Sequence, residues 1–210
     1  MPKNAKISNA VIKRLPRYRR YLYELDRKGV DKISSAELSK MIGYTASQIR
    51  QDLNNFGGFG QQGYGYNVKD LYDEISAILG LDKLYHMVIV GGGNLGHAIA
   101  NYLSAYKTGF MVDAVFDIDP ELIGHEVNGI KVYHTDDLVE FIETNHTDIG
   151  IICTPQGSAQ EVADKLCFAG VRGVWNFAPA DIEVPSHVAL ENVHLADILY
   201  SLAYHMNRNK

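Results

Sequence analysis

The stretch MVIVGGGNLG, residues 87–96, places four apolar residues directly before a Gly-x-Gly-x-x-Gly pattern. A short apolar run of this kind is typical of a buried parallel strand, and the glycines predict a tight turn into a helix. In such a turn the first glycine bends the chain, the second lets a pyrophosphate approach backbone N–H groups, and the third packs helix against strand. The residues expected to contact a dinucleotide here are Gly91, Gly93, Asn94, Leu95 and Gly96.

An acidic residue follows the glycine turn by about 20 residues, the sequence spacing that is typical of dinucleotide-binding folds. Asp117 lies in FDIDP, residues 116–120, directly after the next apolar run. A carboxylate there accepts hydrogen bonds from ribose hydroxyls and repels a 2′-phosphate, which favours NAD+/NADH over NADP. Asp119 is a second candidate, although Asp117 is nearer the end of the strand. A doubly wound domain that binds another nucleotide, or none, is the alternative.

Strands and helices alternate through the rest of the chain, which predicts an α/β fold with a parallel sheet. Loops that follow the later strands are expected to lie at the ligand-binding edge of that sheet and to form the floor of the nicotinamide half. Ordinary strand-end turns are the alternative for both loops. The expected contacts are Thr154, Pro155, Asn176, Phe177 and Ala178. The predicted strands are 87–90, 111–116, 130–133, 149–153 and 173–175, and the predicted helices between the later ones are 136–145 and 158–169.

The first third of the chain shows helix start and stop signals instead. Residues 34–37, SSAE, form a capping box before a helix that stops at Gly43, and TASQ at 45–48 repeats the device before a helix that stops at Gly57. Two short capped helices joined by a tight turn predict a helix-turn-helix.

A glycine- and aromatic-rich segment, FGGFGQQGYGY, follows at residues 56–66. Its five glycines permit a tight hairpin, and its aromatics suit short strands, so we expect the wing of a winged helix. A flexible linker is the alternative. A further helix is predicted over 68–79. The domains expected are therefore a winged-helix domain at 1–80, a Rossmann-like domain at 81–192 and a C-terminal helical segment at 193–210.

Charge is unevenly distributed over these regions. Residues 1–80 contain 13 Lys and Arg against 8 Asp and Glu, although the whole chain has a net charge of −5. A basic N-terminal region on an acidic body indicates that one end meets a polyanion, and a solvated charged helix is the alternative.

In a helix-turn-helix, the N-terminal residues of the second helix enter the major groove of DNA. Arg14 could reach the phosphates of the DNA backbone or could instead face the other domain. The predicted DNA-contacting residues are Arg14, Thr45, Ser47, Gln48, Arg50, Gln51, Gln61, Gln62 and Tyr64.

Several function classes are disfavoured. No apolar run approaches the ~20 residues of a membrane span, and the basic first 20 residues lack the apolar core of a signal peptide. Cys153 and Cys167 form no disulfide framework, which fits a reducing cytoplasm, and we expect both to be core residues. No metal-ligand spacing or nucleophile motif is present. A nucleotide-binding fold without a reaction centre indicates a sensor, and a small NAD-dependent oxidoreductase and a CoA- or nucleotide-binding subunit are the alternatives.

The apolar C-terminal helix predicts dimerisation. Over 195–206, its leucine, isoleucine and methionine residues fall on one helical face, and no sheet position is left for it. Packing against its own domain is the alternative. One small monomer would bind DNA weakly, so we expect a symmetric homodimer on operator DNA.

Taken in order, these motifs resemble the Rex family of redox-sensing transcriptional repressors. The resemblance covers nearly all 210 residues. It implies a homodimer that binds operators when NAD+ dominates, releases them when NADH accumulates, and exchanges its terminal helix between protomers. The segments that carry it are RLPRYRRYL (14–22), TASQIRQDLNNFG (45–57), GQQGYGY (60–66), IVGGGNLG (89–96), FDIDP (116–120), WNFAP (175–179) and ENVHLADILYSL (191–202).

The resemblance also implies a sensing network of Arg20, Tyr102 and the fourth residue of ENVHL. That residue is His194 here, where the family commonly has Asp. Asp197, on the same helix, is our candidate to take part of the role, or else His194 makes sensing pH-dependent. Gln51 and Gln62 also stand where basic residues are usual, which predicts operator binding with a shallower salt dependence.

Overall fold

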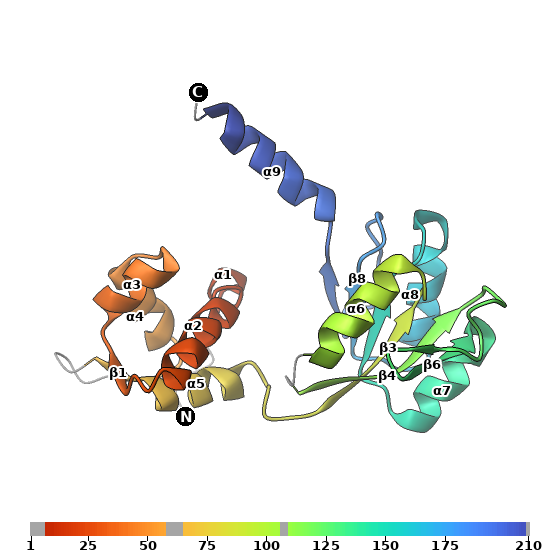
Figure 1. Ribbon diagram of the computed structural model, residues 1–210, viewed down its shortest axis with the longest axis horizontal. Coiled ribbons are helices and arrows are strands. Elements are labelled where there is room, and N and C mark those ends of the chain that lie inside the picture. The colour runs from red at the N-terminus through yellow and green to blue at the C-terminus, as the bar shows by residue number, and fades with distance from the viewer. Residues whose placement is uncertain (1–6, 58–64, 106–108, 209–210) are drawn as a thin grey trace. The chain divides into compact units, whose positions relative to one another are not determined.

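The structure is a computed structural model of the 210-residue chain that describes residues 7–57, 65–105 and 109–208. The chain divides into two compact units, Met1–Lys83 (unit 1) and Leu84–Lys210 (unit 2). Each unit has its own elements (Figure 1). The division lies three residues beyond the boundary expected from the sequence.

Unit 1 is a small helical domain with one short sheet. Two short strands, at residues 32–33 and 66–67, pair antiparallel, Lys32 with Asn67 and Ile33 with Tyr66. This pairing is the strand arrangement at the base of a winged helix, and the expected hairpin tip at 58–64, with Gln61, Gln62 and Tyr64, lies outside the described residues. The elements are α1 (Asn9–Ile12), α2 (Leu15–Arg27), β1 (Lys32–Ile33), α3 (Ser35–Ile42), α4 (Ala46–Asn54), β2 (Tyr66–Asn67) and α5 (Val68–Ile78).

The helix-turn-helix forms as its capping residues predict. Ser34 and Glu37 make both hydrogen bonds of a capping box at α3. Thr45 accepts a hydrogen bond from the Gln48 N–H at the start of α4. Between the helices, Gly43 ends α3 in the left-handed region at φ 78°. The local signals therefore fix both helix starts and the turn that joins them.

Gly43→Ala is expected to destabilise unit 1 by about 1 kcal/mol, because an alanine strains the left-handed backbone. No atom lies within 4 Å of the added Cβ, so strain is the whole cost. Urea unfolding followed by circular dichroism measures it. Gly157→Ala is the matched control, since its Cβ also meets open space but its φ is unstrained. Equal loss of stability in both variants would contradict the backbone explanation.

Unit 2 contains a seven-stranded sheet in the order β5-β6-β4-β3-β7-β8-β9. Strands β6, β4, β3, β7, β8 and β9 are parallel, and numbered along the chain they read 3-2-1-4-5-6, the order of a dinucleotide-binding Rossmann fold. The order reverses between β3 and β7, which sets the ligand crevice at their carboxyl ends. The strands are β3 (Tyr85–Val90), β4 (Phe110–Asp117), β5 (Glu126–Val127), β6 (Ile130–His134), β7 (Ile149–Ile152), β8 (Gly173–Asn176) and β9 (Ala189–Asn192).

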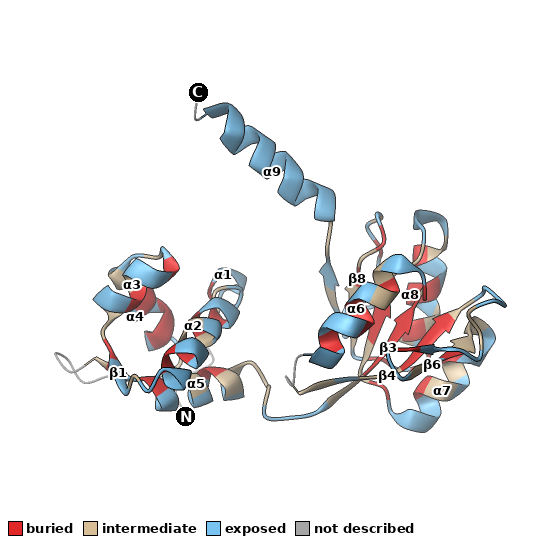
Figure 2. Ribbon diagram, in the orientation of Figure 1, coloured by how far each residue is buried: buried red, intermediate tan, exposed pale blue. Residues whose placement is uncertain are grey.

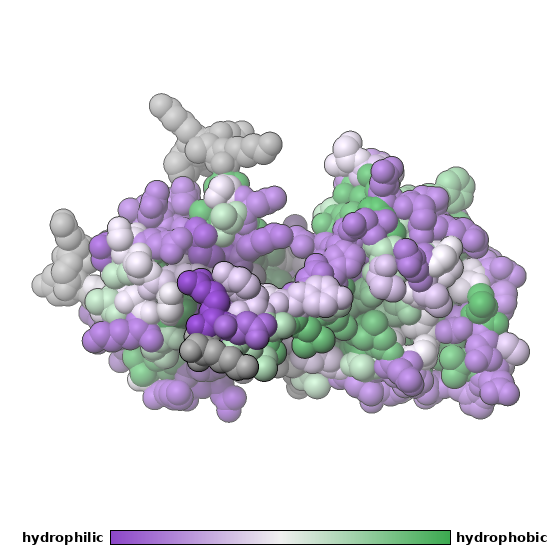
Figure 3. Space-filling model, turned by 90° about the horizontal axis from the view of Figure 1, so that it is seen from above, coloured by the Kyte–Doolittle hydropathy of each residue, from purple (hydrophilic) through white to green (hydrophobic). Residues whose placement is uncertain are grey.

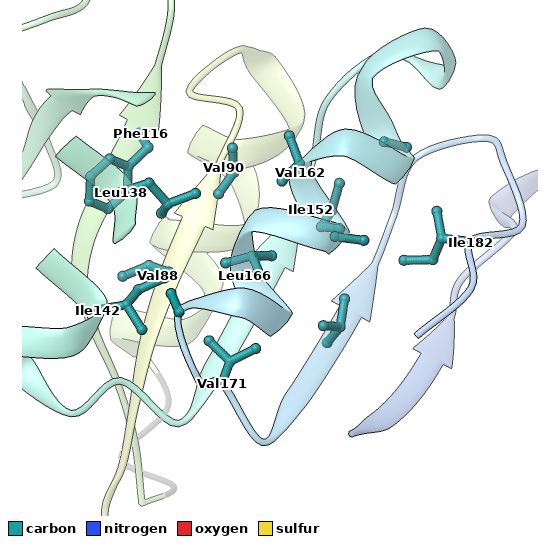
Figure 4. Close-up of a cluster of buried hydrophobic side chains, with 14 of the residues drawn as sticks. Val88, Val90, Phe116, Leu138, Ile142, Ile152, Val162, Leu166, Val171 and Ile182 are labelled. Atoms are coloured by element: carbon teal, nitrogen blue, oxygen red, sulfur yellow. The ribbon is translucent and has the colours of Figure 1, made fainter. Parts of the chain in front are cut away.

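Helices cover the two faces of this sheet and enclose two apolar cores. One core contains Val88, Val90 and Ile152 of the central strands, with Val162 and Leu166 of the helix that follows β7 (Figure 4). The other packs the helix after β3 against Met87 and Ile89. The helical elements are α6 (Asn94–Ala105), η1 (Thr135–Asp137), α7 (Leu138–Asn145), η2 (Gln156–Ser158), α8 (Ala159–Phe168) and α9 (Leu195–Arg208).

Three strands were not predicted: β1, β5 and β9. Each is two to four residues long and carries too little apolar alternation to be read from sequence. β9 pairs with β8 through residues such as Glu191 and Asn192, which are exposed. Long-range pairing therefore decides these strands.

The C-terminal helix α9 has no buried residue (Figure 2). Leu195, Ile198, Leu199, Leu202 and Met206 are each more than half exposed. The alternative in which this apolar face packs on its own domain does not hold in the single chain. A 14-residue helix that leaves such a face in water lacks the packing that stabilises helices in proteins.

Candidate functional site

The glycine turn after β3 is built for close approach. Gly91 has φ 104°, and a Cβ there would meet the Cys153 carbonyl oxygen at 2.6 Å. A Cβ at Gly96 would collide with the Gly91 carbonyl oxygen. Gly93 differs, because its Cβ would meet nothing within 4 Å. The first and third glycines therefore serve internal packing, and the second keeps an open surface against which a ligand can lie.

Asp117 stands at the end of β4 beside this turn. Its Oδ2 accepts a hydrogen bond from the Gly92 N–H at 2.5 Å, and its Oδ1 accepts from the Ile118 and Asp119 N–H groups at 2.7 and 2.9 Å. Asp119 instead caps its own turn by accepting from the Glu121 N–H at 2.9 Å. The geometry favours Asp117 over Asp119 as the ribose acceptor, because Asp117 is the carboxylate that faces the glycine turn.

A cleft of about 510 Å³ lies over the carboxyl ends of β3, β4 and β7. It brings together five residues predicted from sequence: Gly91, Gly93, Asp117, Thr154 and Pro155. Thr154 and Pro155 were expected at the nicotinamide half, yet they line the same cleft as Asp117.

The residues present fit a dinucleotide. Within the described part of the chain, the buried Thr154 Oγ1 has no hydrogen-bond partner. A buried hydroxyl without a partner costs free energy, and a polar ligand group in the cleft would supply one. The open Gly93 surface and the Asp117 carboxylate complete a place for phosphate and for ribose.

The loop after β8 is occupied differently. The Asn176 side chain is buried and binds three groups: its Nδ2 donates to the Ala180 O and the Asn192 Oδ1, and its Oδ1 accepts from the Ala178 N–H. Phe177 packs its ring on Trp175, with centroids 4.6 Å apart. Asn176 therefore holds the strand-end loop together, and its contact with a nucleotide stays a prediction.

Sequence reasoning missed one wall of the cleft. Side chains of α8, and of the residue that precedes α8, line the cleft at helical spacing. Residues that follow β4 and β6 also line the cleft. An i, i+3, i+4, i+7 reading from Ser158 would have found the first set. The missed lining residues are Ile118, Thr135, Leu138, Ser158, Glu161, Val162 and Lys165.

Cys153 borders the cleft but is chemically quiet. It follows β7 as a half-buried residue, and burial raises the pKa of its thiol to about 12. Cys167 is half-buried in α8, where burial and the nearby Asp164 also raise its pKa. At pH 8 the thiolate fraction of Cys153 is thus on the order of 10⁻⁴. Both cysteines contact core residues, as expected.

We therefore expect Cys153 to react with iodoacetamide far more slowly than free cysteine at pH 8, and its rate to keep rising with pH up to at least 10. Mass spectrometry of the two cysteine-containing peptides, followed over time, gives both rates. Rapid alkylation of Cys153 at neutral pH would contradict a thiol held protonated by burial.

In unit 1, α4 presents polar side chains outward. Thr45, Ser47, Arg50 and Gln51 are exposed, Gln48 is half-buried, and Ile49 and Leu53 are buried on the opposite side. The Arg50 guanidinium donates to the Ser35 Oγ at 2.9 Å. On the face drawn in Figure 3, unit 1 carries mostly hydrophilic residues. The contact of these α4 side chains with DNA stays a prediction.

Arg14, predicted to reach the DNA backbone, is placed in an internal ion pair. Its guanidinium donates to both carboxylate oxygens of Asp52, at 2.6 and 2.7 Å. The Tyr18 hydroxyl donates to the same carboxylate at 2.6 Å. Burial alone would raise the pKa of Asp52, but hydrogen bonds from Arg14 and Tyr18 outweigh it and lower the pKa.

The residues of the predicted sensing network belong to the two separate units. Arg20 is exposed on α2, and Tyr102 of α6 is 56% exposed. His194 Nε2 lies 3.1 Å from the Asp181 Oδ1, and Asp197 is exposed in the first turn of α9. Within residues 7–57, 65–105 and 109–208, no group of three His, Cys, Asp or Glu could hold a metal ion. No helix in that part of the chain is long and apolar enough to cross a membrane.

Comparisons with known proteins agree with this geometry. Residues 6–54 match the family described as "Putative DNA-binding protein N-terminus", and residues 82–180 match "CoA binding domain". "Redox-sensing transcriptional repressor Rex" of Thermoanaerobacter pseudethanolicus is 54% identical over 210 residues, which are all of this chain and 94% of the relative. The chain belongs to the Rex family.

Solved structures place both units in that family. The structure titled "Crystal structure of RSP in complex with beta-NAD+ and operator DNA" is 54% identical, with a TM-score of 0.92 over 98% of this chain and 95% of the other. RSP "in complex with beta-NADH" is 51% identical, with a TM-score of 0.89 over 98% and 97%. The Rex resemblance read from the sequence motifs is confirmed.

Proposed function

We propose that this Rex family member is a transcriptional repressor that senses the NADH/NAD+ ratio. As a homodimer it binds operator DNA through α4 and the following wing, and it releases the operator when NADH replaces NAD+. The observation that carries the proposal is that one chain contains both a dinucleotide-binding sheet and a helix-turn-helix. The sheet has the strand order 3-2-1-4-5-6, and Asp117 lies beside its glycine turn.

The nucleotide half of the proposal rests on the cleft. Backbone N–H groups at the start of α6 would bind the diphosphate beside Gly93, and the Asp117 carboxylate would accept hydrogen bonds from the ribose hydroxyls. A negative charge there disfavours a 2′-phosphate, so NAD+ and NADH are the ligands rather than their phosphorylated forms. Oxidised nicotinamide carries one positive charge that reduced nicotinamide lacks, so discrimination arises from groups near that ring.

The dimer follows from α9. Its apolar face is exposed in the part of the single chain that the structure describes, and a second copy would offer an identical apolar helix to cover it. Two recognition helices then read a pseudo-palindromic operator with half-sites one turn or a multiple apart. We assign residues 1–80 as the DNA-binding unit, residues 81–192 as the nucleotide-binding unit, and residues 193–210 as the segment that the two protomers exchange.

The remaining residue assignments are part of the same proposal. The cofactor contacts are those of the glycine turn, Asp117, Tyr102 and the loops at 154–155 and 176–178. The DNA contacts are those of α4 and the wing. The protein acts in the cytoplasm, where operator DNA and the free nucleotide pool meet.

Fluorescence anisotropy of a labelled operator duplex tests the function. The operator is first selected from a random-sequence library by the full chain. At fixed salt, NAD+ is expected to leave the complex intact, and NADH is expected to dissociate it. By linkage, the factor by which NADH lowers DNA affinity equals the factor by which DNA lowers NADH affinity. Operator binding indifferent to both nucleotides would contradict the sensor.

A CoA-binding subunit is the second candidate, because residues 82–180 match that family description. The Asp117 carboxylate favours NAD: it binds the two free ribose hydroxyls of NAD, whereas the ribose of CoA carries a 3′-phosphate that it would repel. Calorimetric titration with CoA and with NADH separates the two, and tighter binding of CoA would decide for the second candidate.

Asp197→Ala is expected to weaken NAD+ binding by about tenfold and to leave NADH binding unchanged, so the ratio of NADH affinity to NAD+ affinity should rise by about tenfold. The physical reason is that an acidic group stabilises the positively charged nicotinamide of NAD+ and leaves NADH unaffected. Calorimetry of both nucleotides measures the ratio, and an unchanged ratio would exclude Asp197. An affinity ratio that changes across neutral pH would instead assign part of the sensing to His194.

A further inference from the structure

A buried polar cluster joins two helices of unit 1 that are far apart in sequence. Asp52, on the inner side of α4, is 2% exposed. Its carboxylate receives three hydrogen bonds from α2 and the residue that precedes it: two from Arg14, at 2.6 and 2.7 Å, and one from Tyr18, at 2.6 Å. Every bond crosses more than 30 positions of chain, so the cluster is a tertiary link and not a helix cap.

The cluster is attached to the helix whose orientation decides DNA reading. α4 packs mainly on α3, whereas α2 packs mainly on α5. Around the α4 axis, Asp52 lies with Ile49 and Leu53 on the buried side, away from the exposed Ser47 and Gln51. Apolar contacts from Ile49 and Leu53 hold α4 against the core but are non-directional. The bidentate Arg14–Asp52 pair adds directional bonds that fix the rotation of α4 about its axis.

A small rotation has a large effect on base contacts. Side-chain tips lie about 5–6 Å from a helix axis, so a rotation of about 20° moves them about 2 Å. A shift of that size breaks a hydrogen bond, whose length range spans only about half an ångström. Precision in the angle of α4 is therefore a condition for reading base edges, although phosphate attraction tolerates its loss.

We infer that Asp52, held by Arg14 and Tyr18, is the positioning residue that sets the angle of the recognition helix and thereby the operator specificity. The inference rests on the proposed DNA-binding function. We call Asp52, Arg14 and Tyr18 the clamp. Arg14 belongs to this clamp and not to the phosphate-contacting residues, because its Nε and Nη2 atoms both donate to Asp52.

Asp52→Asn separates this role from its rivals, because charge and positioning predict opposite signs. The substitution keeps the shape and removes one negative charge from a DNA-binding unit. Electrostatics alone predicts tighter DNA binding, and a freed Arg14 would add a phosphate contact and steepen the salt dependence. A misoriented α4 predicts that affinity for the operator falls while affinity for scrambled DNA is unchanged or rises.

The measurement is the ratio of affinities for the selected operator and for a scrambled duplex of equal length, with the full chain at fixed salt. Asp52→Asn is expected to lower this ratio by about tenfold, the value of one good base contact. Tyr18→Phe removes one of the three bonds without changing charge and is expected to lower it by about threefold. Asp73→Asn is the matched control, since Asp73 is exposed, pairs only locally with Lys69 in α5 at 2.8 Å, and carries the same charge.

Each outcome decides. A lower operator affinity with unchanged scrambled affinity supports the clamp, and equal loss on both duplexes, or no loss, overturns it. Hydrogen exchange of residues 46–54 in the free protein gives a readout that does not need DNA. In Asp52→Asn and Tyr18→Phe these amides are expected to exchange faster while those of α5 stay protected, and unchanged protection of α4 would also overturn the clamp. If the wild-type chain prefers no operator, the proposed function fails, and hydrogen exchange alone decides whether the clamp exists.

Discussion

A chain that carries Leu199→Glu and Leu202→Glu is expected to be monomeric and to lose operator affinity by at least about 100-fold. Both leucines lie on the apolar face of α9 and are 63% and 54% exposed in the single chain. Burying a leucine in an interface contributes about 1.5–3 kcal/mol, and a symmetric dimer contains each leucine twice. Glutamate at the same positions would bring uncompensated charges into that interface. The combined loss exceeds about 6 kcal/mol, enough to separate the protomers at micromolar concentration.

Operator affinity falls with dimerisation because each protomer contributes one recognition helix. A dimer binds the second half-site as an intramolecular event, which raises avidity by about 10²–10⁴ over one half-site. Sedimentation equilibrium gives the oligomeric state, and anisotropy gives the affinity. Ser201→Glu is the control for charge: it adds one glutamate to the same helix, against two in the double variant, but lies off the apolar face. A dimer that persists in the double variant, or a monomer with full operator affinity, would contradict the role of α9.

The prediction for α9 shows where sequence is informative. The helix itself follows from its 3.6-residue apolar period, and so do the capped helices α3 and α4 and the glycine turn before α6. These features depend on residues close together in the chain. Their partners do not, and the sequence indicated a dimer because no sheet position remained for the helix and because one small monomer would bind DNA weakly.

The Asp52 cluster shows where sequence reasoning falls short. Arg14 lies in a basic run, so charge alone predicted a phosphate contact, whereas the structure pairs it with an acidic residue 38 positions away. The same limit hid β9, whose exposed residues give no strand pattern until β8 is beside them. For α8, the lining side chains had helical spacing, but the face they present depends on how the helix packs across the sheet.

The second large effect is expected at Asp117. Asp117→Ala removes the acceptor for two ribose hydroxyls, and hydrogen bonds to a charged group contribute about 1.5–3 kcal/mol each. With water replacing part of this loss, NADH affinity is expected to fall by about 100-fold. Operator release should then require about 100-fold more NADH, while operator affinity without nucleotide stays unchanged. Calorimetry and the anisotropy titration measure the two quantities separately.

Asp119→Ala is the matched control, because it removes the neighbouring carboxylate, which caps only its own turn. Its NADH affinity is expected to stay within about threefold of wild type. The reverse result, with loss at Asp119 and none at Asp117, would exchange the two assignments.

Asp117→Asn separates the two roles of the carboxylate. An asparagine oxygen can still accept from the Ile118 and Asp119 N–H groups, whereas the Gly92 N–H loses its acceptor and the negative charge is gone. Repulsion of a 2′-phosphate by that charge is worth several-fold to more than tenfold at the separations within the cleft. The ratio of NADPH to NADH affinity should therefore rise by about tenfold in Asp117→Asn. An unchanged ratio would mean that the shape of the cleft, and not the charge of Asp117, excludes the phosphate.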